Sequence, residues 1–95
     1  MRLDKPVIEF LKQQIVMTVP GAKLYLFGSR TDDEARGGDI DLMILTQIPV
    51  DKRQLRTIRV EFIKKFGWQK LDLVNFTYED NSVFKRIIQT NAIEL

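Results

Sequence analysis

Residues 28–42 read GSRTDDEARGGDIDL: a Gly-Ser pair, a polar segment that ends in two glycines, and two Asp residues separated by one isoleucine. Residues 22–27 come directly before this segment, and their apolar and aromatic side chains predict a short buried strand. Residues 39–46 are mainly apolar apart from the two Asp residues, and they predict a second strand. Polar residues and glycines between two apolar runs are typical of a loop or one short helical turn. The segment therefore joins two strands and places acidic side chains where the second one begins.

The acidic residues need a physical explanation, because Asp is depleted in strands. Side chains alternate along a strand, so Asp39 and Asp41 share one face, with their carboxylates roughly 6 to 7 Å apart. At an effective dielectric constant near 20, their repulsion is about 2 to 3 kcal/mol. A third predicted strand, residues 70–76, repeats the feature at Asp72. Because carboxylates and substrate phosphates together bind Mg²⁺, the three Asp residues predict a metal site that can hold two ions.

The rest of the pattern indicates three helices. Residues 3–18 carry apolar side chains at three- and four-residue spacing, residues 51–67 contain a second amphipathic stretch, and a third begins near residue 80 or 81. The third helix is expected to pack through Val83, Phe84, Ile87 and Ile88. This order predicts one α/β (α+β) domain over residues 1–95, a small mixed sheet flanked by helices. The second helix is long enough for a crossover between parallel strands, which would bring the acidic ends of both strands together.

Composition narrows the chemistry. The 95 residues contain neither His nor Cys, which excludes disulfides, thiolate metal sites and any Ser-His or Cys-His catalytic pair. Catalysis would depend on carboxylates, Lys, Arg, Tyr or a bound metal ion. A net charge of +2 is too small to indicate nucleic-acid binding, so no direct nucleic-acid partner is expected. No apolar run approaches the roughly 20 residues of a membrane span, and no signal peptide is recognisable, so we expect a cytoplasmic protein without a membrane partner.

Gly28 and Ser29 are candidates for phosphate binding. A glycine lets the backbone approach phosphate oxygens closely, and a serine hydroxyl and the N–H groups of the next turn can donate hydrogen bonds to them. Arg30 and Arg36 are within sequence reach of the same anion. Each residue also has a simpler interpretation, since Gly-Ser commonly ends a strand and a single Arg is commonly a surface charge. Only the combination with the carboxylates indicates a nucleotide site.

These residues resemble a family signature. The pieces Gly28-Ser29-Arg30, Glu34-Ala35-Arg36 and Asp39-Ile40-Asp41-Leu42, followed late in the chain by Asp72, are similar to the signature of the DNA polymerase beta-like nucleotidyltransferase superfamily. In particular, the chain resembles the minimal nucleotidyltransferases (MNT). The order of helices and strands agrees over nearly the whole chain, so the resemblance implies the nucleotidyltransferase fold.

The resemblance also implies roles and a partner. Asp39 and Asp41 would bind both metal ions, and Asp72 would complete the site and help to deprotonate an acceptor hydroxyl. Gly28 and Ser29 would hold the phosphates of ATP, with the two nearby arginines as helpers. Many minimal members are antitoxins of HEPN-domain ribonuclease toxins. The resemblance therefore implies transfer of AMP from ATP to a toxin tyrosine within a hetero-oligomer.

Two departures from the family pattern bear on activity. The segment between Ser29 and Asp39 is one residue shorter than the commonest form, which could shift Arg36 relative to the phosphates. Gly38 stands where a Ser usually precedes the first Asp, which removes a hydroxyl from beside the metal ions. No carboxylate is lost. Two alternatives stay open: a non-catalytic antitoxin that neutralises its partner by binding alone, and a nucleotidyltransferase that acts on a small molecule or an RNA end.

Overall fold

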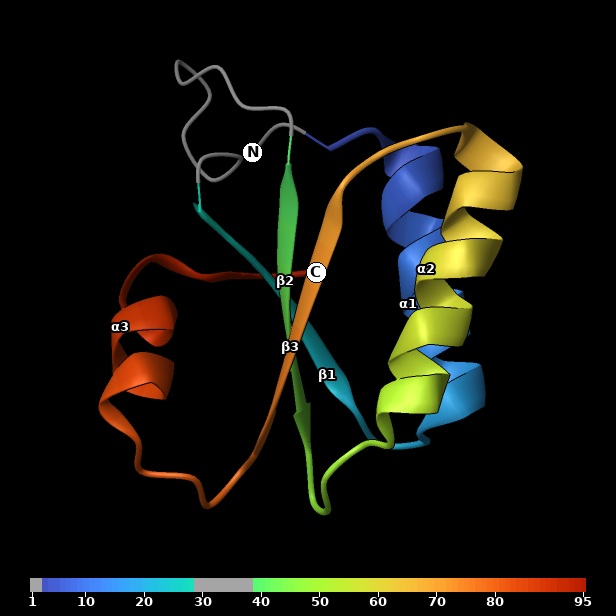
Figure 1. Cartoon of the computed structure of the whole chain (residues 1–95). Coiled ribbons are helices and arrows are strands. Elements are labelled where there is room, and N and C mark those ends of the chain that lie inside the picture. The colour runs from blue at the N-terminus through green and yellow to red at the C-terminus, as the bar shows by residue number, and fades with distance from the viewer. Residues whose placement is uncertain (1–2, 29–38) are drawn as a thin grey trace.

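The computed structural model describes residues 3–28 and 39–95. The elements follow one another as α1 (Lys5–Thr18), β1 (Lys23–Phe27), β2 (Ile40–Thr46), α2 (Lys52–Phe66), β3 (Leu71–Thr77), α3 (Val83–Asn91) and β4 (Ile93–Glu94). Figure 1 shows the sheet between two layers, with α1 and α2 on one face and α3 on the other. Within the described ranges, no helix combines the length and the apolar character that crossing a membrane requires.

The sheet is mixed, as predicted. Its strand order is β3-β2-β1-β4, with β2 and β3 parallel and with β1 antiparallel to both β2 and β4. The parallel pair is joined by α2, which is the crossover that such a pair requires. Strand β4 was not predicted, because two residues are too few to show an alternating pattern. The parallel arrangement brings the first residues of β2 and β3 to the same end of the sheet.

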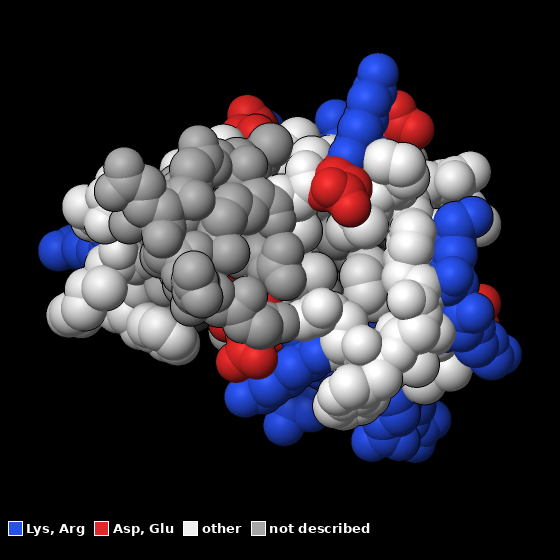
Figure 2. Space-filling model, turned by 90° about the horizontal axis from the view of Figure 1, so that it is seen from above, with Lys and Arg blue, Asp and Glu red and all other residues white. Residues whose placement is uncertain are grey.

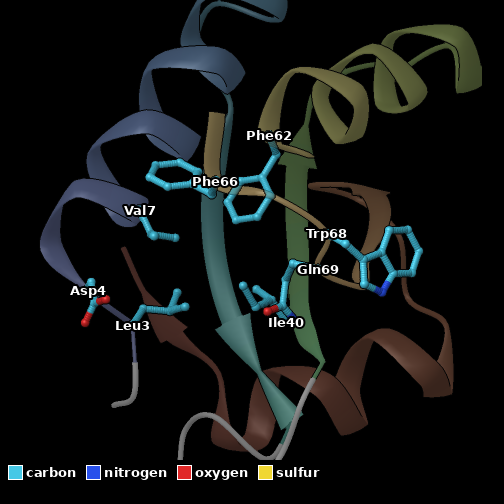
Figure 3. Close-up of a pocket in the computed structure, with 8 residues that line it drawn as sticks. All are labelled: Leu3, Asp4, Val7, Ile40, Phe62, Phe66, Trp68 and Gln69. Carbon is cyan, nitrogen blue, oxygen red and sulfur yellow. The ribbon is translucent and has the colours of Figure 1, made fainter. Parts of the chain in front are cut away.

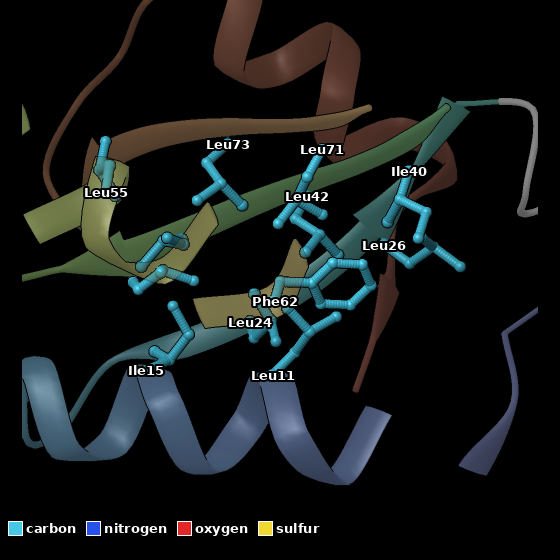
Figure 4. Close-up of a cluster of buried hydrophobic side chains, with 12 residues drawn as sticks. Leu11, Ile15, Leu24, Leu26, Ile40, Leu42, Leu55, Phe62, Leu71 and Leu73 are labelled. Atoms are coloured by element: carbon cyan, nitrogen blue, oxygen red, sulfur yellow. The ribbon is translucent and has the colours of Figure 1, made fainter. Parts of the chain in front are cut away.

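The main hydrophobic core lies between the sheet and the two helices α1 and α2 (Figure 4). Ile40, Leu42 and Ile44 of β2 all lie on this face, opposite to Asp41, as the alternation of side chains along a strand requires. Phe62 of α2 is its largest fully buried side chain, and truncation of such a residue to Ala typically costs about 3 to 5 kcal/mol. A smaller cluster around Met43 lies on the opposite face, under α3. The acidic side chains of β2 therefore point away from the main core.

The ends of α2 agree with the sequence prediction. The Asp51 carboxylate accepts a hydrogen bond from the backbone N–H of Arg53 at 2.8 Å, and the Gln54 side chain accepts one in return from the N–H of Asp51 at 3.3 Å. Gly67 ends the helix with a φ of 87°, a conformation that favours glycine. This reciprocal cap fixes where α2 begins.

The predicted packing face of α3 is wrong in part. Ile88 is buried as expected, and the ring of Phe84 packs edge-on against Phe76 with 5.7 Å between centroids, but Val83 and Ile87 are 69% and 65% exposed. The buried position next to Ile88 belongs to Lys85, whose ammonium group donates hydrogen bonds to the carbonyls of Thr77, Tyr78 and Asp80 at 3.0, 2.9 and 2.9 Å. Three carbonyl acceptors satisfy all three donors of an ammonium group, which explains how a charged side chain can replace an apolar one here.

Candidate functional site

The predicted carboxylates lie at the end of the sheet where β2 and β3 begin, on the face that α3 covers. Asp41 and Asp72 are paired positions in neighbouring parallel strands. Asp39 comes directly before β2, and alternation places it on the same face as Asp41. In Figure 1 this is the upper end of the sheet. The structure therefore brings together three acidic residues that are up to 33 positions apart in the sequence.

Gly28 completes this end of the sheet from the other side. It follows β1, in which Phe27 is paired with Asp41, and its φ of 78° lies in the region that favours glycine. A Cβ at this position would collide with Oδ2 of Asp41, and it would lie 3.2 Å from Cγ and 3.3 Å from Cβ of the same residue. Gly28 is therefore required by close approach to a carboxylate as well as by its backbone conformation.

Lys70 is a member of this site that the sequence did not reveal. Its ammonium nitrogen lies 3.5 Å from Oδ2 of Asp39 and 3.9 Å from Oδ2 of Asp72. The sequence does contain one indication of this: Lys70 and Asp72 are two positions apart, so their side chains point to the same face, as those of Asp39 and Asp41 do in the neighbouring strand. The register that places the two patterns side by side is not visible in the sequence.

The pKa of the Asp41 carboxyl group is raised above its ordinary value. Partial burial is the largest cause, followed by a side-chain hydrogen bond with Asp72 and by the negative charges of Asp72 and Asp39. The positive charge of Lys70 opposes the shift. The negative charges of Asp39 and Asp72 thus add to the effect of burial on Asp41, and the positive charge of Lys70 reduces it.

The three carboxylates are suitable ligands for a divalent cation, although the described side chains are not arranged around one common point. Carboxylate oxygens are the ligands that Mg²⁺ prefers, and the missing Cβ of Gly28 lets the Asp41 carboxylate lie close against the backbone. Among residues 3–28 and 39–95, no three acidic side chains already stand together as a metal cage. Instead they are linked in series, with Lys70 between Asp39 and Asp72. Of the predicted phosphate-binding residues, Ser29, Arg30 and Arg36 lie outside the described part of the chain, so their roles stay predictions.

A cavity of about 320 Å³ opens near the same end of the molecule, between α1, α2 and the start of β2 (Figure 3). The cavity is lined by Val7, Phe62, Phe66 and Ile40 among others, so it lies on the face of the sheet that α1 and α2 cover. Ile40 and Asp41 are consecutive strand residues and point to opposite faces. The sheet therefore separates this cavity from the carboxylates.

Figure 2 shows how the charged side chains are distributed at this end of the molecule. Figure 2 views the molecule from above, and the basic side chains lie around the rim of the described surface without forming a continuous patch across it. The net charge of the chain is only +2.

Comparison with known proteins identifies the family of this chain and the fold that it shares with solved structures. The sequence profile of the family described as "Polymerase beta, Nucleotidyltransferase" matches residues 7–95. Among curated proteins, no sequence relative was found.

Solved structures share the fold. In a mutant of the toxin–antitoxin pair MntA-HpeT, the matching chain is 20% identical with a TM-score of 0.73, and the match covers 99% of this chain and 72% of that one. A Shewanella oneidensis complex of a tri-AMPylated HEPN toxin with an MNT antitoxin gives 20% identity and a TM-score of 0.63, covering 94% and 65%. At such identities the likeness shows the fold alone. Because the family profile matches from the first helix to the last residue, and the fold places its acidic residues on one edge, the chain belongs to the polymerase beta nucleotidyltransferase family.

Proposed function

We propose that this chain is a Mg²⁺-dependent adenylyltransferase that transfers AMP from ATP to a tyrosine hydroxyl of a HEPN toxin and thereby acts as its antitoxin. One observation carries the proposal: Asp41 and Asp72 are paired positions in two parallel strands, and Lys70 links Asp39 to Asp72. Family membership supports nucleotidyl transfer. The acceptor is supported by the AMPylated toxin in the complex of similar fold.

The chemistry follows from the residues in place. Asp39, Asp41 and Asp72 would hold the Mg²⁺ ions. Ions bound there would neutralise the triphosphate and lower the pKa of the acceptor hydroxyl. Asp72 would accept the hydroxyl proton, the hydroxyl oxygen would bond to the α-phosphorus, and pyrophosphate would leave as its bond breaks. Gly28 would keep the Asp41 carboxylate accessible to ligands, because it has no side chain to cover it.

A binding-only antitoxin is the second candidate, and Lys70 is the observation that favours it. From the sequence, the repulsion among the carboxylates seemed to require a metal ion. The ammonium group of Lys70 relieves part of that repulsion without one. Retention of the three carboxylates is therefore weaker evidence for catalysis than the sequence suggested, and only a measurement of AMP transfer separates the two candidates.

The test is intact-mass spectrometry of the HEPN protein expressed with this chain, after incubation with Mg²⁺ and ATP. The proposal predicts a mass gain in whole AMP units. The Asp39→Asn/Asp41→Asn double variant should abolish the gain, whereas Glu79→Gln, which changes an exposed acidic residue, should leave it intact. Neutralisation of the toxin without any mass gain would refute the catalytic proposal and support binding alone.

A further inference from the structure

Lys70 places an ammonium group among the predicted metal ligands. Its nitrogen is 3.5 Å from an Asp39 oxygen and 3.9 Å from an Asp72 oxygen, so one cation bridges carboxylates that belong to two different strands. We propose that Lys70 is a resident counter-ion, which holds the carboxylate cluster together in the nucleotide-free protein and competes with a divalent cation for Asp39 and Asp72. This inference rests on the proposed function, since it takes those two residues as metal ligands.

The backbone fixes where Lys70 stands. Its carbonyl accepts a hydrogen bond of 3.0 Å from the backbone N–H of Ile40, which continues the parallel ladder by one step beyond the first paired residues of β2 and β3. Lys70 thus lies beside Asp39, as Asp72 lies beside Asp41. All four side chains share the α3 face, because residues two positions apart in a strand point the same way. The position of Lys70 is therefore set by the sheet and not by a mobile surface contact.

The side chain of Lys70, unlike its backbone, is free to leave. It is 60% exposed, and its two carboxylate partners are 48% and 45% exposed. Ion pairs with this exposure are weak, since water solvates both partners and side-chain entropy opposes the pairing. Rotation about the four-carbon stem would move the ammonium group into solvent while the ladder stays intact. Lys70 is a positioning residue that can be displaced.

Competition has a measurable consequence. Removing a positive charge that sits between two ligands should tighten binding of a divalent cation to the nucleotide-free chain, by about two- to tenfold given the strength of exposed pairs. The same change should destabilise the metal-free protein, since Asp39 and Asp72 then lose the ammonium group that lies between them. Metal binding should become tighter while the metal-free protein becomes less stable. A general loss of stability would not tighten metal binding, so it cannot produce both results.

The experiment measures Mn²⁺ binding to the full chain without nucleotide by calorimetry, together with melting temperature in EDTA. Lys70→Met keeps the apolar stem and removes the charge. Lys64→Met is the matched control, because Lys64 is also exposed and makes one ion pair, with Glu61 at 3.4 Å, away from the site. Lys70→Arg restores the charge. We expect a two- to tenfold tighter Mn²⁺ affinity and a lower melting temperature in EDTA for Lys70→Met, with neither change in Lys64→Met.

Two results would overturn the inference, and only one of them would also overturn the proposed metal dependence of the transfer. Equal Mn²⁺ affinity in the wild type and Lys70→Met, with binding present in both, refutes the counter-ion role and leaves the proposed metal-dependent transfer standing. Absence of Mn²⁺ binding in both proteins refutes the inference and the metal requirement together. Wild-type behaviour of Lys70→Arg alongside the expected Lys70→Met result assigns the effect to the charge at position 70.

Discussion

Gly28→Ala is the substitution for which the structure gives the sharpest expectation. An alanine there incurs two separate costs. The first is the positive φ of 78°, which for a residue with a Cβ costs about 1 to 2 kcal/mol. The second is the collision of the new methyl group with the carboxylate of Asp41. Forced overpacking of this kind typically costs about 1 to 3 kcal/mol, or less where the struck group can rotate.

Gly21→Ala is a control that shares only the first cost. Gly21 has a φ of 86°, and a Cβ there would meet nothing within 4 Å. The difference between the two variants therefore measures the contact with Asp41. For a domain of this size, 1 kcal/mol corresponds to roughly 4 to 8 °C in melting temperature. We expect Gly28→Ala to melt at least about 4 °C below Gly21→Ala in thermal denaturation followed by circular dichroism, and to lose Mn²⁺ binding that Gly21→Ala retains.

A double-mutant cycle tests the cause. Asp41→Ala removes the carboxylate that the new methyl group strikes, so Gly28→Ala should cost less in the Asp41→Ala background than in the wild type. If Gly28→Ala and Gly21→Ala are equally stable and bind Mn²⁺ equally, the close approach of Gly28 to Asp41 does not constrain this site and the reasoning fails.

Three further measurements test other parts of the structure. Because the pKa of Asp41 is raised, the folded chain binds the Asp41 proton more tightly than the unfolded chain does. In EDTA, the stability of the wild type relative to Asp41→Asn should therefore fall as the pH rises from the ordinary pKa of 3.8 through the raised pKa. A stability difference that does not change with pH contradicts the shift. Lys85→Met leaves three carbonyls without the ammonium donor and should lower the free energy of unfolding by about 2 to 3 kcal/mol, measured by urea denaturation. The control Lys64→Met, at an exposed position, should change it very little. Equal stabilities of the two variants would show that the buried ammonium group is dispensable. The Asn75 side chain accepts a hydrogen bond from the loop after β2 and donates hydrogen bonds to β2 itself. Asn75→Ala should lower the free energy of unfolding by about 1 to 3 kcal/mol relative to the exposed control Asn81→Ala. A loss below about 0.5 kcal/mol would show that these hydrogen bonds do not stabilise the fold.

The acidic residues show how far local pattern reaches. Alternation along a strand depends only on neighbouring residues, so the sequence placed Asp39 and Asp41 on one face of β2 and Ile40, Leu42 and Ile44 on the other. A crossover helix between two strands implies parallel pairing, and parallel pairing places Asp72 at the same end of the sheet as Asp39 and Asp41. The cap at Asp51 and the end at Gly67 were also readable, because helix termini are decided within a few residues.

What the sequence left undecided depends on register and on contacts between distant segments. Lys70 joins the carboxylates only because β3 pairs with β2 at one register, and a shift by one residue would turn its side chain to the opposite face. Gly28 could be recognised as a turn residue, but its contact with Asp41 arises from the antiparallel pairing of β1 with β2. The burial of Lys85 in place of its apolar neighbours required three carbonyls from the turn before α3, whose positions no helical periodicity encodes. The sequence by itself determined which faces are acidic and which are apolar, since that is local chain geometry. Only the tertiary structure decided which charges meet, since that is set by the packing of the whole sheet.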